Sequence, residues 1–168
     1  VNAIVQFASA ETAESTKSLN EKRLSTALFT DIVQSTDKLL NMGDHGWRKM
    51  LDAHDVIAHQ TVAAHRGRIV KNTGDGILAV FDGPVKALQC SQALITGLEA
   101  IGLPIRAGLH VGEVVNRGDD VTGIAVNIAA RVMDKAKSGQ TLLTKTLKDL
   151  TGGSNIEFES VGKFELKG

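Results

Sequence analysis

The stretch 71–76 (KNTGDG) constrains the fold of this chain more than any other part of the sequence. It separates two apolar runs with strand character, 68–70 and 77–81, and two glycines flank Asp75, which predicts a hairpin with a carboxylate at its tip. A hard divalent cation prefers oxygen ligands, and glycine backbone allows a phosphate to come close. The pattern is therefore typical of a turn that holds a metal-bound nucleotide, although a plain Asp-Gly hairpin has the same signature.

Hydrophobic periodicity divides the rest of the chain into alternating strands and helices. We expect strands at 24–31, 68–70, 77–81, 104–111, 141–144 and 156–164, and helices at 44–65, 84–102, 124–132 and 146–150. A helix start signal, Ser35-Thr36, follows the first strand, and glycine and polar residues across 112–123 indicate a short hairpin or arm. This order predicts an α/β fold, an α+β sandwich with a ferredoxin-like βαββαβ core, extra C-terminal strands, and helices packed on a largely antiparallel sheet.

Length and composition bound the class of protein. At 168 residues the chain is long enough for one domain, which we place at 23–168 after a tail or linker at 1–22. Lys plus Arg equals Asp plus Glu at 19 each, so nothing indicates nucleic-acid binding, and no apolar run reaches the ~20 residues of a membrane span. We therefore expect a cytoplasmic protein, whose single cysteine, Cys90, packs in the core. The chain opens on Val1 rather than Met, which is compatible with an upstream regulatory domain.

Asp31 ends the strand-like run 24–31, and the helix start Ser35-Thr36 follows it closely. In open sheets ligands bind at such strand exits, and the first amides of a helix can meet a phosphate. If this strand lies beside the hairpin, Asp31 and Asp75 can share a pair of divalent cations. Such a pair suits displacement at phosphorus, because the cations lower the pKa of an attacking hydroxyl and neutralise the leaving phosphates.

A third motif lies on the helix 124–132, where Asn127 and Arg131 stand four residues apart and so share one face. A hydrogen bond on the helix surface would explain that pair without any ligand. The runs that carry a resemblance are LFTDI (28–32), KNTGDG (71–76) and VNIAAR (126–131). Together they resemble the class III nucleotidyl cyclase catalytic domain, of the bacterial adenylyl cyclase type. The resemblance covers 23–168, and Asp120, seven residues before Asn127, adds to the match.

The resemblance implies a role for each matching residue. Asp31 and Asp75, helped by the Ile32 carbonyl, would bind two divalent cations, Mg or Mn, together with the triphosphate of the nucleotide. Lys71 and Asp120 would read the base, and adenine, with an acceptor at N1 and a donor at its amino group, suits this donor and acceptor pair. A surface lysine beside a turn and a loop carboxylate remain the alternative interpretation of these two residues, and a second aspartate stands directly before Asp120.

The same resemblance implies that Asn127 positions the ribose and that Arg131 stabilises charge at the reacting phosphate. The family builds its sites at a dimer interface, with the metal ligands from one protomer and the base, ribose and arginine residues from the other. We therefore expect a homodimer with two identical sites. A triphosphate-binding lysine near the C-terminus would fall on Lys167, or less well on Lys163. The turn 112–120 is shorter than the dimerisation arm of some members, which places the strength of the dimer in question.

These roles predict an adenylyl cyclase, in which the ribose 3'-hydroxyl of ATP attacks the α-phosphate and releases cyclic AMP and pyrophosphate. A guanylyl cyclase is the nearest alternative, although it would favour other residues at Lys71 and Asp120. Palm-like folds that synthesise diguanylate or polymerise nucleotides also use two carboxylates, but the helix with Asn127 and Arg131 argues against them. A non-catalytic nucleotide-binding dimerisation domain is a further alternative, which degraded metal and arginine positions would favour.

Overall fold

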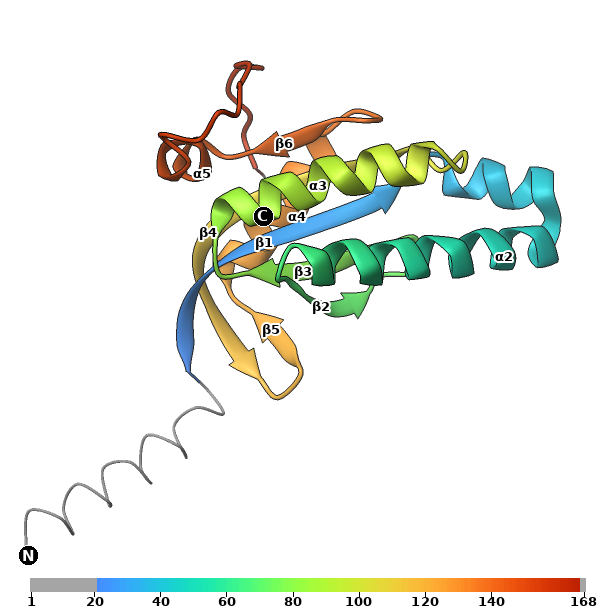
Figure 1. Cartoon of the computed structure of the whole chain (residues 1–168), viewed down its shortest axis with the longest axis horizontal. Helices are drawn as coiled ribbons and strands as arrows, with labels where there is room; N and C mark the ends of the chain where they lie inside the picture. The colour runs from blue at the N-terminus through green and yellow to red at the C-terminus, as the bar shows by residue number, and fades with distance from the viewer. Residues whose placement is uncertain (1–20, 167–168) are drawn as a thin grey trace, which may run out of the picture.

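Strands and helices alternate through residues 21–166, which are the part of the chain that the computed structural model describes (Figure 1). In chain order the elements are β1 Lys22–Ile32, α2 Ser35–Ala64, β2 Arg68–Asn72, β3 Gly76–Phe81, α3 Pro84–Glu99, β4 Ile105–Arg117, β5 Asp120–Thr122, α4 Ile124–Lys135, β6 Thr141–Leu143 and α5 Lys145–Leu150. The strands form one sheet in the order β2-β3-β1-β4-β5, and β6 pairs with β4. Every pairing is antiparallel except the parallel one between β4 and β6. The predicted βαββαβ core on a largely antiparallel sheet is confirmed.

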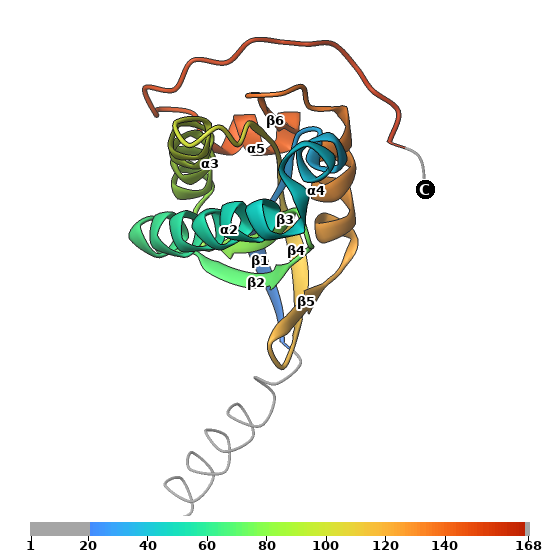
Figure 2. The ribbon, with the colours of Figure 1, turned by 90° about the vertical axis from the view of Figure 1, so that its right-hand side faces the viewer.

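The sheet separates two clusters of hydrophobic side chains. Helices α2 and α3 cover one face of the sheet, and α4 covers part of the opposite face (Figure 2). Because side chains alternate along a strand, Leu28 and Ile32 of β1 pack in the first cluster, whereas Ala27 and Phe29 belong to the second. By the same alternation Asp31 projects on the side of α4, at the end of the strand.

Two glycines of β4 let α4 approach the sheet closely. A Cβ atom at Gly108 would lie 2.2 Å from the backbone nitrogen of Met133, and one at Gly112 would lie 2.9 Å from the Cβ of Ala125. A side chain at either position would push the helix away, so α4 can pack this close to β4 only because both residues are glycine. The helix that carries the VNIAAR motif is thereby fixed against β4.

The structure also corrects details of the sequence prediction. β4 continues without a break to Arg117, and α2 begins at the start signal Ser35 and bends at Gly43, which has a φ of 73°. The predicted strand 156–164 is wrong, because this segment forms no strand, although Ile156 packs onto the core. Alternating apolar residues indicate that one side of a segment is buried. A strand also needs a neighbouring strand whose backbone pairs with its N–H and C=O groups.

Four other expectations concern Cys90, a membrane span, the N-terminal tail and Lys167. Cys90 is fully buried, and burial raises the pKa of its thiol to about 12, which confirms a packing role. Across residues 21–166 no helix has the length and apolar character needed to cross a bilayer. Of the tail expected at 1–22, the first 20 residues lie outside the described part of the chain, and β1 begins at Lys22. Lys167 lies outside the described residues as well.

Candidate active site

Asp31 and Asp75 meet where β1 and β3 pair. Asp31 stands opposite Gly76 in the register of these strands, and the Ile32 amide donates a hydrogen bond of 2.7 Å to the Asp75 carbonyl. A Cβ atom at Gly76 would lie 1.8 Å from the Thr30 carbonyl oxygen, so only glycine permits the approach. The two strands are neighbours, as the sequence analysis required, and the two carboxylates lie at the same end of this strand pair.

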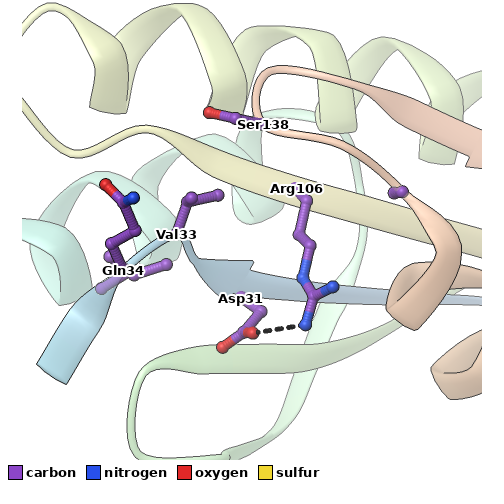
Figure 3. A pocket seen from close by; sticks show the side chains of 7 residues that line it. Asp31, Val33, Gln34, Arg106 and Ser138 are labelled. Atoms are coloured by element: carbon purple, nitrogen blue, oxygen red, sulfur yellow. Dashed lines mark hydrogen bonds and ion pairs between the residues drawn. The ribbon is translucent and has the colours of Figure 1, made fainter.

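The Asp31 carboxylate lies between the Arg106 guanidinium and the Asp75 carboxyl. Arg106 donates from Nη2 to Asp31 Oδ2 at 3.1 Å, and Figure 3 shows the two groups facing each other. Burial raises the pKa of Asp31, the adjacent Asp75 carboxyl raises it further, and Arg106 opposes that rise. Ser35, the first residue of α2, donates from Oγ to Asp75 Oδ2 at 2.9 Å. The arrangement crowds negative charge at a point where a bound cation would relieve it.

A cavity of about 280 Å³ opens beside this carboxylate (Figure 3). It is lined by Asp31, Ile32, Val33, Gln34, Arg106, Ala136 and Ser138. Ile32 has a hydrocarbon side chain, which packs in the core, so its backbone carbonyl is the group that could bind a metal. Within the described residues no cluster of three or more His, Cys, Asp or Glu side chains is placed to hold a metal ion. Two carboxylates still fit Mg²⁺, which commonly completes its coordination with water and substrate phosphates.

Lys71 and Asp120 form an ion pair between the two edges of the sheet. Lys71 Nζ lies 3.3 Å from Asp120 Oδ1, although β2 and β5 stand at opposite ends of the strand order. A second contact, from Arg68 Nη1 to the Asp119 carbonyl at 3.2 Å, joins β2 to the turn before β5. The Val121 amide donates to Asp120 Oδ1 at 2.9 Å, and this bond and Lys71 lower the pKa of Asp120. The carboxylate is therefore held ionised, as a hydrogen-bond acceptor.

Asn127 and Arg131 lie one turn apart on α4, which follows β5 almost directly in the chain. Asn127 is exposed and Arg131 is half-buried. The predicted residues thus fall into three groups: the carboxylates at β1 and β3, the ion pair of Lys71 with Asp120, and the two polar residues of α4. Lys163, the weaker choice for a triphosphate-binding lysine, is exposed on the C-terminal segment.

The sequence analysis missed Arg106, which stands opposite Asp31 in the register of β1 and β4. Its Nη1 also donates to the Asp134 carbonyl at 3.1 Å, so it links the carboxylate to the last turn of α4. A charged side chain within the apolar run 104–111 was the available signal. Ser35 was interpreted only as a helix start, whereas its hydroxyl reaches the carboxylate pair.

Comparison with known proteins bears on the family of the chain. Residues 19–168 match the family model described as the adenylate and guanylate cyclase catalytic domain. A putative adenylate cyclase 3 from Rhizobium meliloti is 29% identical over 156 residues, which cover 87% of this chain and 26% of that protein. An adenylate cyclase from Streptomyces coelicolor is 30% identical over 125 residues, which cover 73% of this chain and 32% of that protein. The chain spans about a quarter to a third of the length of these relatives.

Solved structures show the same fold. The crystal structure of an adenylate/guanylate cyclase/hydrolase from Silicibacter pomeroyi matches with a TM-score of 0.73 at 26% identity, covering 88% of this chain and 91% of that chain. The adenylyl cyclase CyaB from P. aeruginosa has a TM-score of 0.74 at 18% identity, covering 79% and 82% of the two chains. Since the family model also spans nearly the whole sequence, the chain belongs to the family of adenylate and guanylate cyclase catalytic domains.

Proposed function

We propose that this domain is an adenylyl cyclase, which converts ATP to 3',5'-cyclic AMP and pyrophosphate in the cytoplasm. The observation that carries the choice of ATP is the ion pair between Lys71 and Asp120. The ammonium group can donate to N1 of adenine, and the carboxylate, kept ionised by its lowered pKa, can accept from the amino group. Guanine presents the opposite order of donor and acceptor and would leave partners unmatched.

The chemistry is assigned to the cavity beside Asp31. Divalent cations, Mg or Mn, bound there would lower the pKa of the ribose 3'-hydroxyl and neutralise charge on the leaving pyrophosphate. Asp31 and Asp75 would hold them together with the Ile32 carbonyl, while the Ser35 hydroxyl keeps the Asp75 carboxylate oriented. The Arg106 guanidinium faces the same cavity and is suited to bind phosphate oxygens.

A homodimer completes each site in this proposal. Asp31 pairs with Arg106 near the start of β4, whereas Asp120 pairs with Arg117 at its end, so these two carboxylates lie at different ends of that strand. This separation supports sites shared between two copies of the chain. Each copy would then supply its carboxylates to one site, and its ion pair and the polar residues of α4 to the other.

Incubation of the purified protein with ATP and Mn²⁺, over a range of protein concentrations, tests the proposal. We expect cyclic AMP, with a specific activity that rises with protein concentration as the dimer forms, and a smaller yield of cyclic GMP from GTP in parallel reactions. A larger yield from GTP would establish the guanylyl cyclase alternative instead. No cyclic product at any concentration would favour a non-catalytic dimerisation domain and reject the enzyme.

A further inference from the structure

The turn 71–76 is fastened to helix α2 through the side chain of Asn72. Its Oδ1 accepts a hydrogen bond from the Gly74 amide at 2.8 Å, and its Nδ2 donates to Asp55 Oδ1 at 3.0 Å. The Thr73 amide donates to the Gly76 carbonyl at 2.9 Å, which closes the turn. One amide side chain therefore spans the turn and joins it to a carboxylate on the helix.

Asp55 itself is oriented by a buried neighbour. The His54 side chain is 2% exposed, and its Nδ1 lies 3.0 Å from the same Oδ1 that Asn72 contacts. An ionised carboxylate only accepts hydrogen bonds, so Nδ1 must carry the proton and donate. His54 Nε2 is buried without a hydrogen-bond partner in the described structure. The ring is thus held by the core on one side and directs Nδ1 at Asp55 on the other.

Two residues with assigned roles flank this fastening. Lys71, directly before Asn72, contacts Asp120, and Asp75, three residues after Asn72, adjoins Asp31. Gly74 has a φ of 100° and nothing within 4 Å of an added Cβ, so packing around that position does not hold the turn. The hydrogen bonds of Asn72 therefore act together with the β2–β3 pairing and the Thr73–Gly76 bond to set the spacing between Lys71 and Asp75.

We propose that Asp55 is a positioning residue for nucleotide cyclisation, which acts through Asn72 to hold Lys71 and Asp75 in register. This inference rests on the proposed function. The Asp55 side chain is 42% exposed, but its removal also leaves the buried His54 Nδ1 without its acceptor, so a modest loss of global stability is expected beside the local effect. Locally, removal should loosen the turn, and because the turn carries a residue for each kind of site, metal affinity and base preference should change together.

The experiment compares the full chain with Asp55→Ala, Asp55→Asn and, as a control, Asp52→Ala, an exposed carboxylate three residues earlier on α2. Amide hydrogen exchange across 71–76 and Mn²⁺ binding followed by electron paramagnetic resonance need no turnover. Asp55→Ala should speed exchange at Gly74 and weaken Mn²⁺ binding about two- to tenfold, the effect of losing one hydrogen bond. Asp55→Asn keeps an oxygen for Asn72 and should remain close to wild type, as should the control.

Kinetic measurements then separate the positioning role from the enzyme assignment. At temperatures well below its Tm, which the lost His54 contact should lower by a few degrees, Asp55→Ala should reduce the ratio of ATP to GTP turnover about two- to tenfold. Unchanged amide exchange and Mn²⁺ binding in Asp55→Ala would overturn the positioning role. It would also be overturned if Asp55→Asn sped exchange and weakened Mn²⁺ binding as much as Asp55→Ala does. Absence of cyclic product from the wild-type chain would instead reject the proposed function, while exchange and Mn²⁺ binding still decide whether Asp55 orders the turn.

Discussion

Asp31 and Asp120, two carboxylates of the candidate site, lie in opposite electrostatic environments. Asp31 is largely buried beside Asp75, and its pKa is raised, whereas Asp120 is half exposed beside Lys71, and its pKa is lowered. The pair of Asp31 and Asp75 is short of positive charge in spite of Arg106, so it is suited to receive cations. The pair of Lys71 and Asp120 already balances its charges, so it is suited to the proposed role of presenting a donor and an acceptor to a neutral base.

The largest expected effect tests whether the carboxylates at β1 and β3 and the polar residues of α4 serve different active sites. Asp31→Ala and Arg131→Ala should each lower cyclic AMP production by about 10²–10³-fold, the scale of losing one group that stabilises transition-state charge. When the two inactive chains are mixed, each heterodimer should regain one working site. Equal mixing with random exchange should therefore restore about a quarter of wild-type activity.

The control for this mixing is Asp82→Ala, which removes an exposed carboxylate just after β3 and should leave activity unchanged. Capture of differently tagged chains should show that heterodimers have formed. If proven heterodimers remain inactive, Asp31 and Arg131 of one copy serve the same active site. The proposal of sites shared between two copies would then be wrong.

A smaller effect is expected when only Lys71, of the proposed base-reading pair with Asp120, is changed. Lys71→Met leaves Asp120 without its cation and adenine N1 without a donor, which should lower kcat/KM for ATP about 10- to 100-fold, from roughly 1–3 kcal/mol per unpaired group. The Mn²⁺ concentration for half-maximal activity should stay the same. Lys86→Met, an exposed lysine on α3, is the matched control. A large shift in the Mn²⁺ requirement of Lys71→Met would mean that the pair of Lys71 and Asp120 also affects the proposed metal site at Asp31 and Asp75.

The sequence predicted features that depend on local pattern and missed those that depend on pairing. The hairpin at 71–76 and the ferredoxin-like order followed from residue periodicity, because each element shows its own apolar face. The strand expected at 156–164 failed, since no backbone pairs with that segment. Arg106 escaped notice for the same reason, because its partner Asp31 is 75 residues away and only the register of β1 with β4 joins them.

The motifs located the candidate residues but not the contacts that hold them. Lys71 and Asp120 were expected to act together, and the structure places them within 3.3 Å. Nothing in the local pattern of α2 distinguishes Asp55 from other polar positions of that helix, whereas the fold brings it against Asn72. Anchoring contacts of this kind arise from the packing of distant elements, which a single sequence does not record.

The smallest effects concern stability, and they sharpen the electrostatic contrast. Folding raises the pKa of Asp31 above its ordinary value of 3.8, so its contribution to stability falls as the pH rises through the folded pKa. Asp31→Asn should therefore raise the Tm in EDTA at pH 7 by a few degrees, since ~1 kcal/mol moves the Tm of such a domain by about 2–4 °C. The gain should vanish below pH 3.8, where the wild-type carboxyl is protonated in both states.

Asp120→Asn should act in the opposite direction in the same thermal unfolding series, followed by circular dichroism. The Val121 amide and Lys71 lower the pKa of Asp120, so its favourable contribution is present above pH 3.8 and is lost as the pH falls through the folded pKa. Its Tm should therefore lie slightly below wild type at pH 7, and high salt should reduce the difference because the pair is exposed. Asp119→Asn is the control, since that residue offers its carbonyl rather than its carboxylate to β2. A shift of Asp31→Asn and Asp120→Asn in the same direction would contradict the opposite charge environments from which both groups derive their proposed roles.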